Sequence, residues 1–362
     1  MKLRKLFTFL VLNLLLVSCN ETTSNSFSVN GNEMVYISCL RSIPTDIVKQ
    51  DSYIETIKET FNDVLDRDDV NIITHDFKMN ETGFKQINYE VDNQNEYTKD
   101  NVSNKQMNIS KHNRSYAYNL HESSQPYRSV GLVKSTFYNV KTSVDPLTYS
   151  TYTFYSSAFL VNKDVVITNS DAILKNLNYS GEDDYRFADK VEIDFGLNLI
   201  GESTINKKSS FDESVEVKLA YIDKETYNDK NSKYDFAVLS IDKSLPKYTT
   251  KFNILTDWYD ESVNDDEGLF VVGFQNYSDN VGSNYNNMNQ QINLKTVSNG
   301  SKTFSLNNLQ ESGTYIGSPA MYIGDDGAFN LCGIVNDAHD KTKVEVRKFN
   351  DLILGCIDDI LE

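Results

Sequence analysis

Two aspartates and one serine are the side chains of this chain whose types and positions could support covalent chemistry. Asp171 follows the apolar run 165–168, Asp235 begins the apolar run 235–239, and Ser312 lies in a Glu-Ser-Gly segment before a third apolar run. Acyl transfer needs a nucleophilic heteroatom, a base that deprotonates it and donors for the developing oxyanion. Asp171 could act as the base, although histidine is the side chain most often used. The four histidines are scattered, at positions 75, 112, 121 and 339.

The cysteines and histidines show no metal-ligand spacing, so the sequence predicts neither a metal nor a cofactor. One of the four cysteines, Cys19, belongs to the N-terminal leader. The odd number that remains, Cys39, Cys332 and Cys356, does not make a disulfide framework. Cys332 falls in a predicted strand and Cys356 on the apolar face of a predicted helix. Both are therefore predicted to be buried apolar side chains, with a bridge between them as the alternative.

Residues 1–19 have the pattern of a lipoprotein signal peptide. Three cations, Lys2, Arg4 and Lys5, precede the apolar run 6–17, which is short for a membrane span. The run ends in Leu-Val-Ser-Cys, which resembles the bacterial lipoprotein cleavage box and implies cleavage before Cys19 and acylation of that cysteine, for example with palmitate. Two or more acyl chains would hold the protein at the extracellular face of the cell membrane. The alternative is an ordinary secretory signal with a chance cysteine.

The chain is strongly acidic, with a formal net charge of −17. Removal of the leader takes away three cations and no acids, so the formal charge of the mature chain becomes −20. This charge argues against nucleic acid as a partner and against a basic patch on anionic lipid. Because the acids are scattered, they predict a solvated surface rather than a specific acidic site.

Three segments lie between the leader and the last domain. Residues 20–32 are small and polar and predict a flexible tether. Residues 33–91 predict a small α+β unit with strands at 34–40, 70–74 and 84–91, and with a helix that begins at the Ser52/Glu55 capping box. Residues 92–113 are rich in Asn, Lys, Asp, Gln and Ser and predict a linker. The α+β unit carries no recognisable chemistry and is interpreted as an accessory or partner-facing module.

Residues 114–362 predict a mainly β domain. The predicted strands fall into two groups, 129–138, 151–161, 164–168, 191–195, 215–222 and 236–241, then 269–274, 291–297, 320–323, 331–335 and 344–346. A terminal helix follows, with Asn350 as its N-cap and apolar side chains on one face. This order predicts two packed six-stranded antiparallel β-barrels with a C-terminal helix. The periodicity alone would equally allow a sandwich.

Several of these segments resemble the motifs of trypsin-like (chymotrypsin-fold) serine proteases, in the order of that family, over residues 116–362. Ser156–Phe159 resembles the Gly-Ser/Thr-Gly-Phe strand, Val165–Asn169 the approach to the catalytic histidine, and Asp235–Leu239 the strand of the orienting aspartate. The remaining matches are the Gly-aromatic end of 269–274, Gly317-Ser318-Pro319, the turn 324–327 and the strand 332–335. The resemblance implies the double barrel rather than the sandwich.

The resemblance also implies catalytic positions that this sequence fills with other residues. It places Asp171 at the histidine and Ile316 at the nucleophile, and it retains Asp235 as the orienting aspartate. Isoleucine offers no heteroatom for attack, and two neighbouring carboxylates raise the pKa of one of them instead of preparing an imidazole. Thr314 stands where the family has a glycine of the oxyanion loop. The resemblance therefore implies a protease homologue that has lost catalysis.

Two arrangements would restore chemistry to this region. Ser312 could be the nucleophile in a shifted register, with His339 as its base, but this register adds four residues before the Pro319 strand, and His339 is predicted to lie in a loop. Alternatively, Asp171 and Asp235 could hold a cation. Two carboxylates without a third ligand give that interpretation little support.

Within the trypsin-like group, the chain resembles the lipoprotein peptidases of mollicutes, some of which cleave host immunoglobulin. The resemblance implies a lipid-anchored surface protein that binds an extracellular host protein such as immunoglobulin. Two other functions stay open. One is an active serine endopeptidase with its site shifted to Ser312, and the other is a binding lipoprotein without protease ancestry.

Overall fold

The computed structural model describes the following residues: 25–29, 32–37, 67–88, 114–116, 126–144, 147–177, 185–200, 208–229, 235–256, 269–274, 288–307, 316–324, 328–340 and 343–362. The chain divides into two compact units, residues 1–87 and residues 88–362. Within the described residues, no helix has the length and the apolar character to span a membrane.

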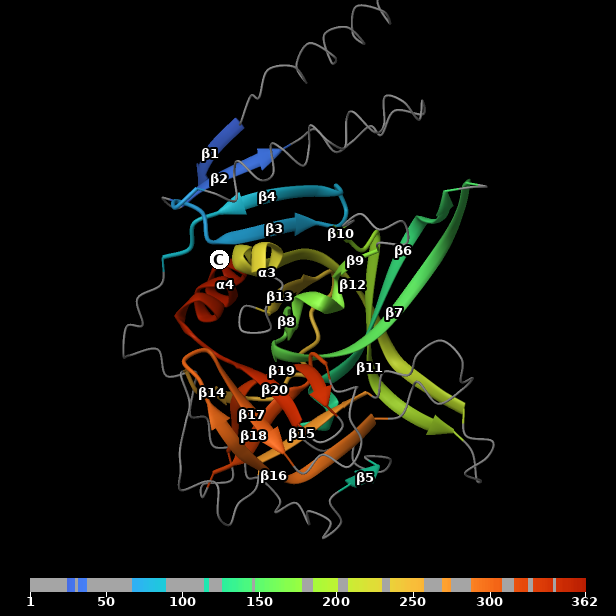
Figure 1. Cartoon of the computed structure of the whole chain (residues 1–362). Coiled ribbons are helices and arrows are strands. Elements are labelled where there is room, and N and C mark those ends of the chain that lie inside the picture. Colours follow the sequence, from blue (N-terminus) through green and yellow to red (C-terminus); the bar gives the residue numbers. More distant parts are fainter. Residues whose placement is uncertain are drawn as a thin grey trace, which may run out of the picture. The chain divides into compact units, whose positions relative to one another are not determined.

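The first unit contains a four-stranded antiparallel sheet in the order β1-β2-β4-β3 (Figure 1). Its strands are β1 (Asn25–Val29), β2 (Asn32–Ile37), β3 (Ile72–Asp76) and β4 (Glu81–Lys85). The sequence predicts a tether over 20–32, but the structure forms β1 there, because Phe27 and Val29 alternate with serines in the two-residue period of a strand. The predicted helix at Ser52 and the predicted linker 92–113 lie outside the described residues.

The second unit begins with a closed six-stranded barrel. Its strands are β6 (Val130–Val144), β7 (Leu147–Asn162), β8 (Val165–Thr168), β11 (Lys190–Ile200), β12 (Lys208–Asp223) and β13 (Ala237–Ile241). Neighbours pair antiparallel in the order β12-β11-β6-β7-β8-β13, and β13 returns to β12. β8 and β13 lie almost wholly in the core, which explains why their sequences read as continuous apolar runs.

A second ring of six strands follows in the chain. It consists of β15 (Leu269–Phe274), β16 (Met288–Asn299), β17 (Thr303–Asn307), β18 (Pro319–Ile323), β19 (Phe329–Asp340) and β20 (Lys343–Lys348). The order is β19-β18-β15-β16-β17-β20, and β20 pairs back with β19. Two short strands add to its edges, β14 (Phe252–Ile254) on β19 and β5 (Arg114–Tyr116) on β16. The predicted mainly β double barrel is confirmed.

Short elements complete the second unit. β9 (Leu174–Asn176) and β10 (Tyr185–Phe187) form a separate two-stranded sheet. Turns of helix lie at η2 (Tyr127–Ser129), η3 (Ser170–Ala172) and α3 (Lys224–Asp229). The predicted terminal helix is α4 (Asp351–Leu361), and the Asn350 side chain accepts a hydrogen bond from the Ile353 N–H at 3.2 Å, which confirms its N-cap. Ile353, Cys356 and Ile357 are buried, whereas Leu361 is exposed.

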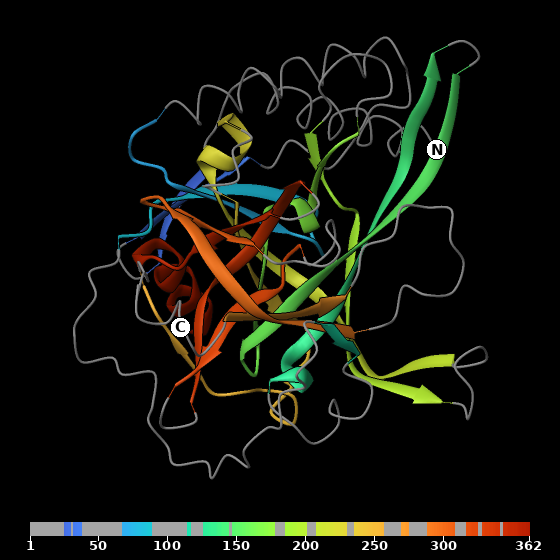
Figure 2. The same ribbon diagram turned by 60° about the horizontal axis from the view of Figure 1, so that its bottom comes forward.

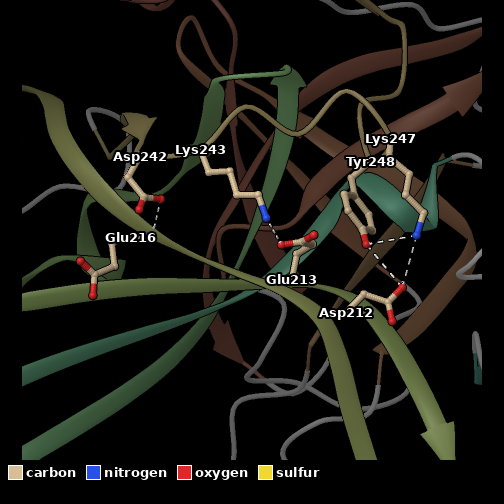
Figure 3. Close-up of polar contacts among 7 residues, drawn as sticks. All are labelled: Asp212, Glu213, Glu216, Asp242, Lys243, Lys247 and Tyr248. Carbon is tan, nitrogen blue, oxygen red and sulfur yellow. Dashed lines mark hydrogen bonds and ion pairs between the residues drawn. The ribbon is translucent and has the colours of Figure 1, made fainter.

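The connection that leaves the first barrel after β13 is fixed onto β12 by polar contacts (Figure 3). Asp242 and Glu216 exchange hydrogen bonds, at 2.8 Å between the Asp242 N–H and the Glu216 carbonyl and at 3.0 Å between the Glu216 N–H and the Asp242 carboxylate. Lys243 pairs with Glu213, and Lys247 lies 3.6 Å from the Asp212 carboxylate. The chain is therefore held in place before it enters the second barrel.

Candidate active site

Asp235 is a buried carboxylate that accepts three hydrogen bonds from one turn. It lies two residues before β13, and its oxygens accept from the Ser170 N–H at 2.6 Å, from the Ser170 hydroxyl at 2.5 Å and from the Asn169 side-chain amide at 3.2 Å. The two residues that donate, Asn169 and Ser170, belong to the short turn that follows β8 and begins η3. Because β8 and β13 are paired neighbours, the aspartate and the turn meet at the same end of the barrel.

The environment of Asp235 disfavours its negative charge. Burial is the largest cause that raises the pKa of the Asp235 carboxyl, to about 7, and the negative charge of Asp171 acts in the same direction. The hydrogen bonds from Ser170 and Asn169 lower this pKa in part. Asp171 itself lies in η3 and is exposed. The two aspartates that the sequence singles out are thus neighbours, one buried and one facing water.

Ile316 reaches the same region through its backbone. The Ser157 N–H of β7 donates to the Ile316 carbonyl at 2.9 Å, and the Ser157 carbonyl accepts from the Thr168 hydroxyl at 2.7 Å. Thr168 ends β8, immediately before the turn that contains Asn169, Ser170 and Asp171. A chain of two hydrogen bonds therefore connects the segment at Ile316 in the second barrel with the turn at Asp171 in the first.

Gly317 allows this close approach of the two barrels. It has φ +81°, and a Cβ atom at this position would lie 2.0 Å from the Ser157 carbonyl oxygen and 2.3 Å from the Thr168 hydroxyl. Only glycine fits both the left-handed conformation and the space. The Gly317 N–H donates to the Val335 carbonyl at 2.8 Å, which fixes the segment onto β19.

The described serines beside this site are buried. Ser318 and Ser157 are fully buried, and Ser156 is 6% exposed. The Ser157 hydroxyl accepts from the Phe274 N–H at 2.8 Å. Ser318 packs on Gly273, where a Cβ atom would come within 1.8 Å of the Ser318 hydroxyl oxygen. These three hydroxyls therefore pack in the protein interior, and Ile316 is the partly exposed residue of its segment.

Other residues with predicted roles fall outside this arrangement. Ser312, Thr314 and Cys19 lie outside the described residues. The sequence places His339 in a loop, but this prediction is wrong, since β19 extends to Asp340 and includes it. The longer strand arises because β20 continues to pair with β19 as far as Asp340↔Lys343. Cys332 and Cys356 are confirmed as buried thiols. In the described part of the chain, no group of three or more His, Cys, Asp or Glu is arranged to hold a metal.

Sequence reasoning missed the residues that connect the site. Ser170 and Asn169 are the donors to Asp235, and Thr168 and Ser157 bridge the two barrels. A signal existed for the first pair, because two small polar residues stand between a buried strand and Asp171. The motif Ser156–Phe159 contains Ser157, but the sequence gives no sign of its hydrogen bonds with partners 11, 117 and 159 positions away along the chain.

Comparisons with known proteins found a family profile and solved structures that are similar to this chain. The trypsin family profile matches residues 135–325, which is more than half of the chain. A Glu endopeptidase structure aligns with 70% of this chain and 99% of its own at a TM-score of 0.46 and 14% identity. The protease Anisep from Arthrobacter nicotinovorans aligns with 68% of this chain and 98% of its own, at a TM-score of 0.45 and 12% identity. The thermostable serine protease AL20 from an extremophilic microorganism aligns with 64% of this chain and 95% of its own, at a TM-score of 0.44 and 13% identity. A search of curated proteins gave no match.

The two closed rings of antiparallel strands and the buried aspartate at the end of β8 and β13 define a trypsin-like serine protease domain. The chain belongs to the trypsin family.

Proposed function

We propose that this chain is a lipid-anchored surface protein whose trypsin-like domain has lost peptide hydrolysis and binds an extracellular protein, with immunoglobulin as the first candidate. The observation that carries the proposal is the pairing of Asp235 with the turn of Asp171. A carboxylate in the position that orients a histidine in the family here accepts three hydrogen bonds from Ser170 and Asn169 and lies within the electrostatic influence of a second carboxylate, Asp171.

Ile316 supports the loss of catalysis. Its backbone is held by Ser157 beside the glycine that the fold needs at 317, so the framework of a nucleophile segment is kept around a hydrocarbon side chain. No covalent acyl intermediate can form on that side chain. In subtilisin, removal of the nucleophile alone lowers kcat by about 2 × 10⁶.

The decisive test uses the purified soluble portion, residues 20–362. A fluorophosphonate probe should leave the wild-type protein unlabelled, and immunoglobulin G should be retained by it with both chains intact on a denaturing gel. Asp171→His combined with Ile316→Ser should gain labelling, whereas each single substitution should not. Labelling of the wild type that disappears in Ser312→Ala would overturn the proposal in favour of an enzyme with a shifted site.

The anchor has its own test. Cells that express the full chain and receive labelled palmitate should incorporate it into the wild type but not into Cys19→Ser, and the variant should appear in the medium. Cys39→Ser is the matched control and should behave as the wild type. Equal incorporation into the Cys19→Ser variant would exclude the proposed lipid site.

A further inference from the structure

Among the described residues of the second unit, β6 and β7 form the longest strand pairing. The strands pair from Val130↔Phe159 to Val144↔Leu147, and Figures 1 and 2 show the ribbon projecting away from the barrel. The pairing of β6 with β11 ends at Thr136, and the pairing of β7 with β8 begins at Phe159. The outer half of the ribbon therefore serves no purpose in closing the barrel.

The outer part of β7 is uncharged and rich in hydroxyl groups. Residues 147–152, beyond the part of β6 that pairs with β11, read LTYSTY and contain no acid or base, in a chain with 52 acidic and 35 basic residues among 362. Side chains two residues apart share a face of a strand, so one face of this outer part carries Tyr149 and Thr151. Tyr149 is 53% exposed. Tyrosine with small hydroxyl residues is the composition that antibody paratopes use to bind folded proteins.

Tyr138, on the facing strand, is an exposed ring on a fixed backbone. A bulge between Phe137 and Val140 interrupts the pairing, and Asn139 has φ +53°. The Tyr138 N–H donates to the Asp189 carboxylate at 2.6 Å, and the Tyr138 carbonyl accepts from Arg186, which also contacts Asp189 at 3.3 Å. The ring is nevertheless 44% exposed. A clamped backbone fixes the point from which the ring projects and so lowers the entropy of ordering that a partner must overcome.

We infer that the outer part of the β6–β7 hairpin, with Tyr138 and Tyr149 as anchors, is the docking surface for a folded extracellular protein of net positive charge. The inference rests on the proposed binding function and adds the surface that carries it. Tyrosine is enriched in the central, energetically dominant part of interfaces, and charged residues are depleted there.

The net charge of the chain indicates the sign of the net charge that a partner should carry. The chain carries a formal −17, whereas residues 137–152, the outer part of the hairpin, contain one base, Lys141, and one acid, Asp145. A partner of positive charge is attracted by the molecule as a whole and can settle on a strip where it desolvates few charges. An acidic partner would be repelled by the molecule as a whole.

The experiment measures binding of residues 20–362 to immobilised immunoglobulin G, the partner named in the proposed function, by surface plasmon resonance. Tyr138→Ser combined with Tyr149→Ser should weaken binding about 30-fold or more, mainly through faster dissociation. Asp189→Ala keeps both rings but removes the clamp, and it should weaken binding several-fold. Leu361→Ser is the control, because it removes a side chain of similar exposure, 40%, from the terminal helix. Raising the salt from about 50 to about 500 mM should slow association.

The outcomes separate the two claims. Binding by the wild type that survives the double tyrosine substitution within about twofold overturns the docking surface and leaves the proposed function standing. No binding by the wild type overturns the immunoglobulin proposal and this inference with it. An association rate that does not fall with salt overturns the positive charge assigned to the partner. Thermal unfolding of every variant is measured, and a variant that melts as the wild type does has lost contacts with the partner, not its fold.

Discussion

Ser170 donates two hydrogen bonds to the same oxygen of Asp235, one from its backbone N–H at 2.6 Å and one from its hydroxyl at 2.5 Å. A single residue therefore supplies two of the three hydrogen bonds that offset the burial of this carboxylate. A hydrogen bond to a charged group contributes about 1.5–3 kcal/mol, and this one is sheltered from water.

Ser170→Ala should lower the free energy of unfolding by about 1.5–3 kcal/mol at neutral pH, because the carboxylate loses its hydroxyl donor while the backbone donor remains. Urea unfolding followed by tryptophan or circular dichroism measures the change. Ser301→Ala, at an exposed turn position, is the control and should change it by less than about 0.5 kcal/mol. A loss for Ser170→Ala as small as that of the control would show that the hydroxyl contributes nothing.

The raised pKa of Asp235 predicts that the free energy of unfolding falls as the pH rises. Because burial and Asp171 raise this pKa in the folded state to about 7, the folded protein binds more protons than the unfolded one between about pH 4 and pH 7. The contribution of Asp235 to stability is therefore fully present below about pH 4 and is lost as the pH rises towards 7. Burial also raises the pKa of Asp223, to about 6, so this residue too makes the protein less stable as the pH rises.

Asp171→Asn tests how much of the raised pKa of Asp235 comes from the negative charge of Asp171. Without the negative charge of Asp171 the pKa of Asp235 falls, so the variant should lose less stability than the wild type between pH 5 and pH 8. Urea midpoints at several pH values give the two curves, and Asp164→Asn provides a control at another aspartate of the first barrel. Parallel curves for Asp171→Asn and the wild type would mean that Asp171 does not act on Asp235.

The approach of the two barrels at Gly317 was not visible in the sequence beyond the presence of a glycine. The pattern Gly317-Ser318-Pro319 identified the segment, but the need for φ +81° and for contact with the Ser157 carbonyl follows only from the packed barrels. Sequence patterns locate such a segment through its residue types. They do not contain the long-range contacts that make the glycine necessary.

Gly317→Ala should prevent stable folding of the second unit, since the added Cβ atom would lie 2.0 Å from a backbone oxygen in addition to the strain of a left-handed conformation. We expect a loss of at least about 4 kcal/mol, or insoluble protein on expression. Gly300→Ala is the matched control, because its nearest neighbour would lie 3.2 Å away, and it should cost no more than about 1 kcal/mol. A soluble Gly317→Ala protein with wild-type unfolding would contradict the described geometry.

The strands that the sequence reveals are those with strong apolar periodicity. β15 was predicted to the residue, and β8 and β13 within one residue at each end, because they are buried on both faces. β14 and β17 were missed, since one has three residues and the other carries only Phe304 and Leu306 between polar neighbours. The β6–β7 hairpin is longer than predicted, because its outer part alternates tyrosine with threonine and serine instead of apolar with polar residues.

Substitutions of Tyr248, in the connection that follows the first barrel, can separate the contribution of packing to stability from that of hydrogen bonding. Its ring is 5% exposed and lies against Phe195 and Gly196, where φ is +69° and a Cβ atom would come within 2.8 Å of the ring. Its hydroxyl is 3.4 Å from both Asp212 and Lys247, which is long for a hydrogen bond (Figure 3). Tyr248→Phe should therefore change the free energy of unfolding by less than about 1 kcal/mol, whereas Tyr248→Ala should cost about 3–5 kcal/mol. Urea unfolding measures both, and equal losses for the two variants would assign the stability to the polar contacts instead of the buried ring.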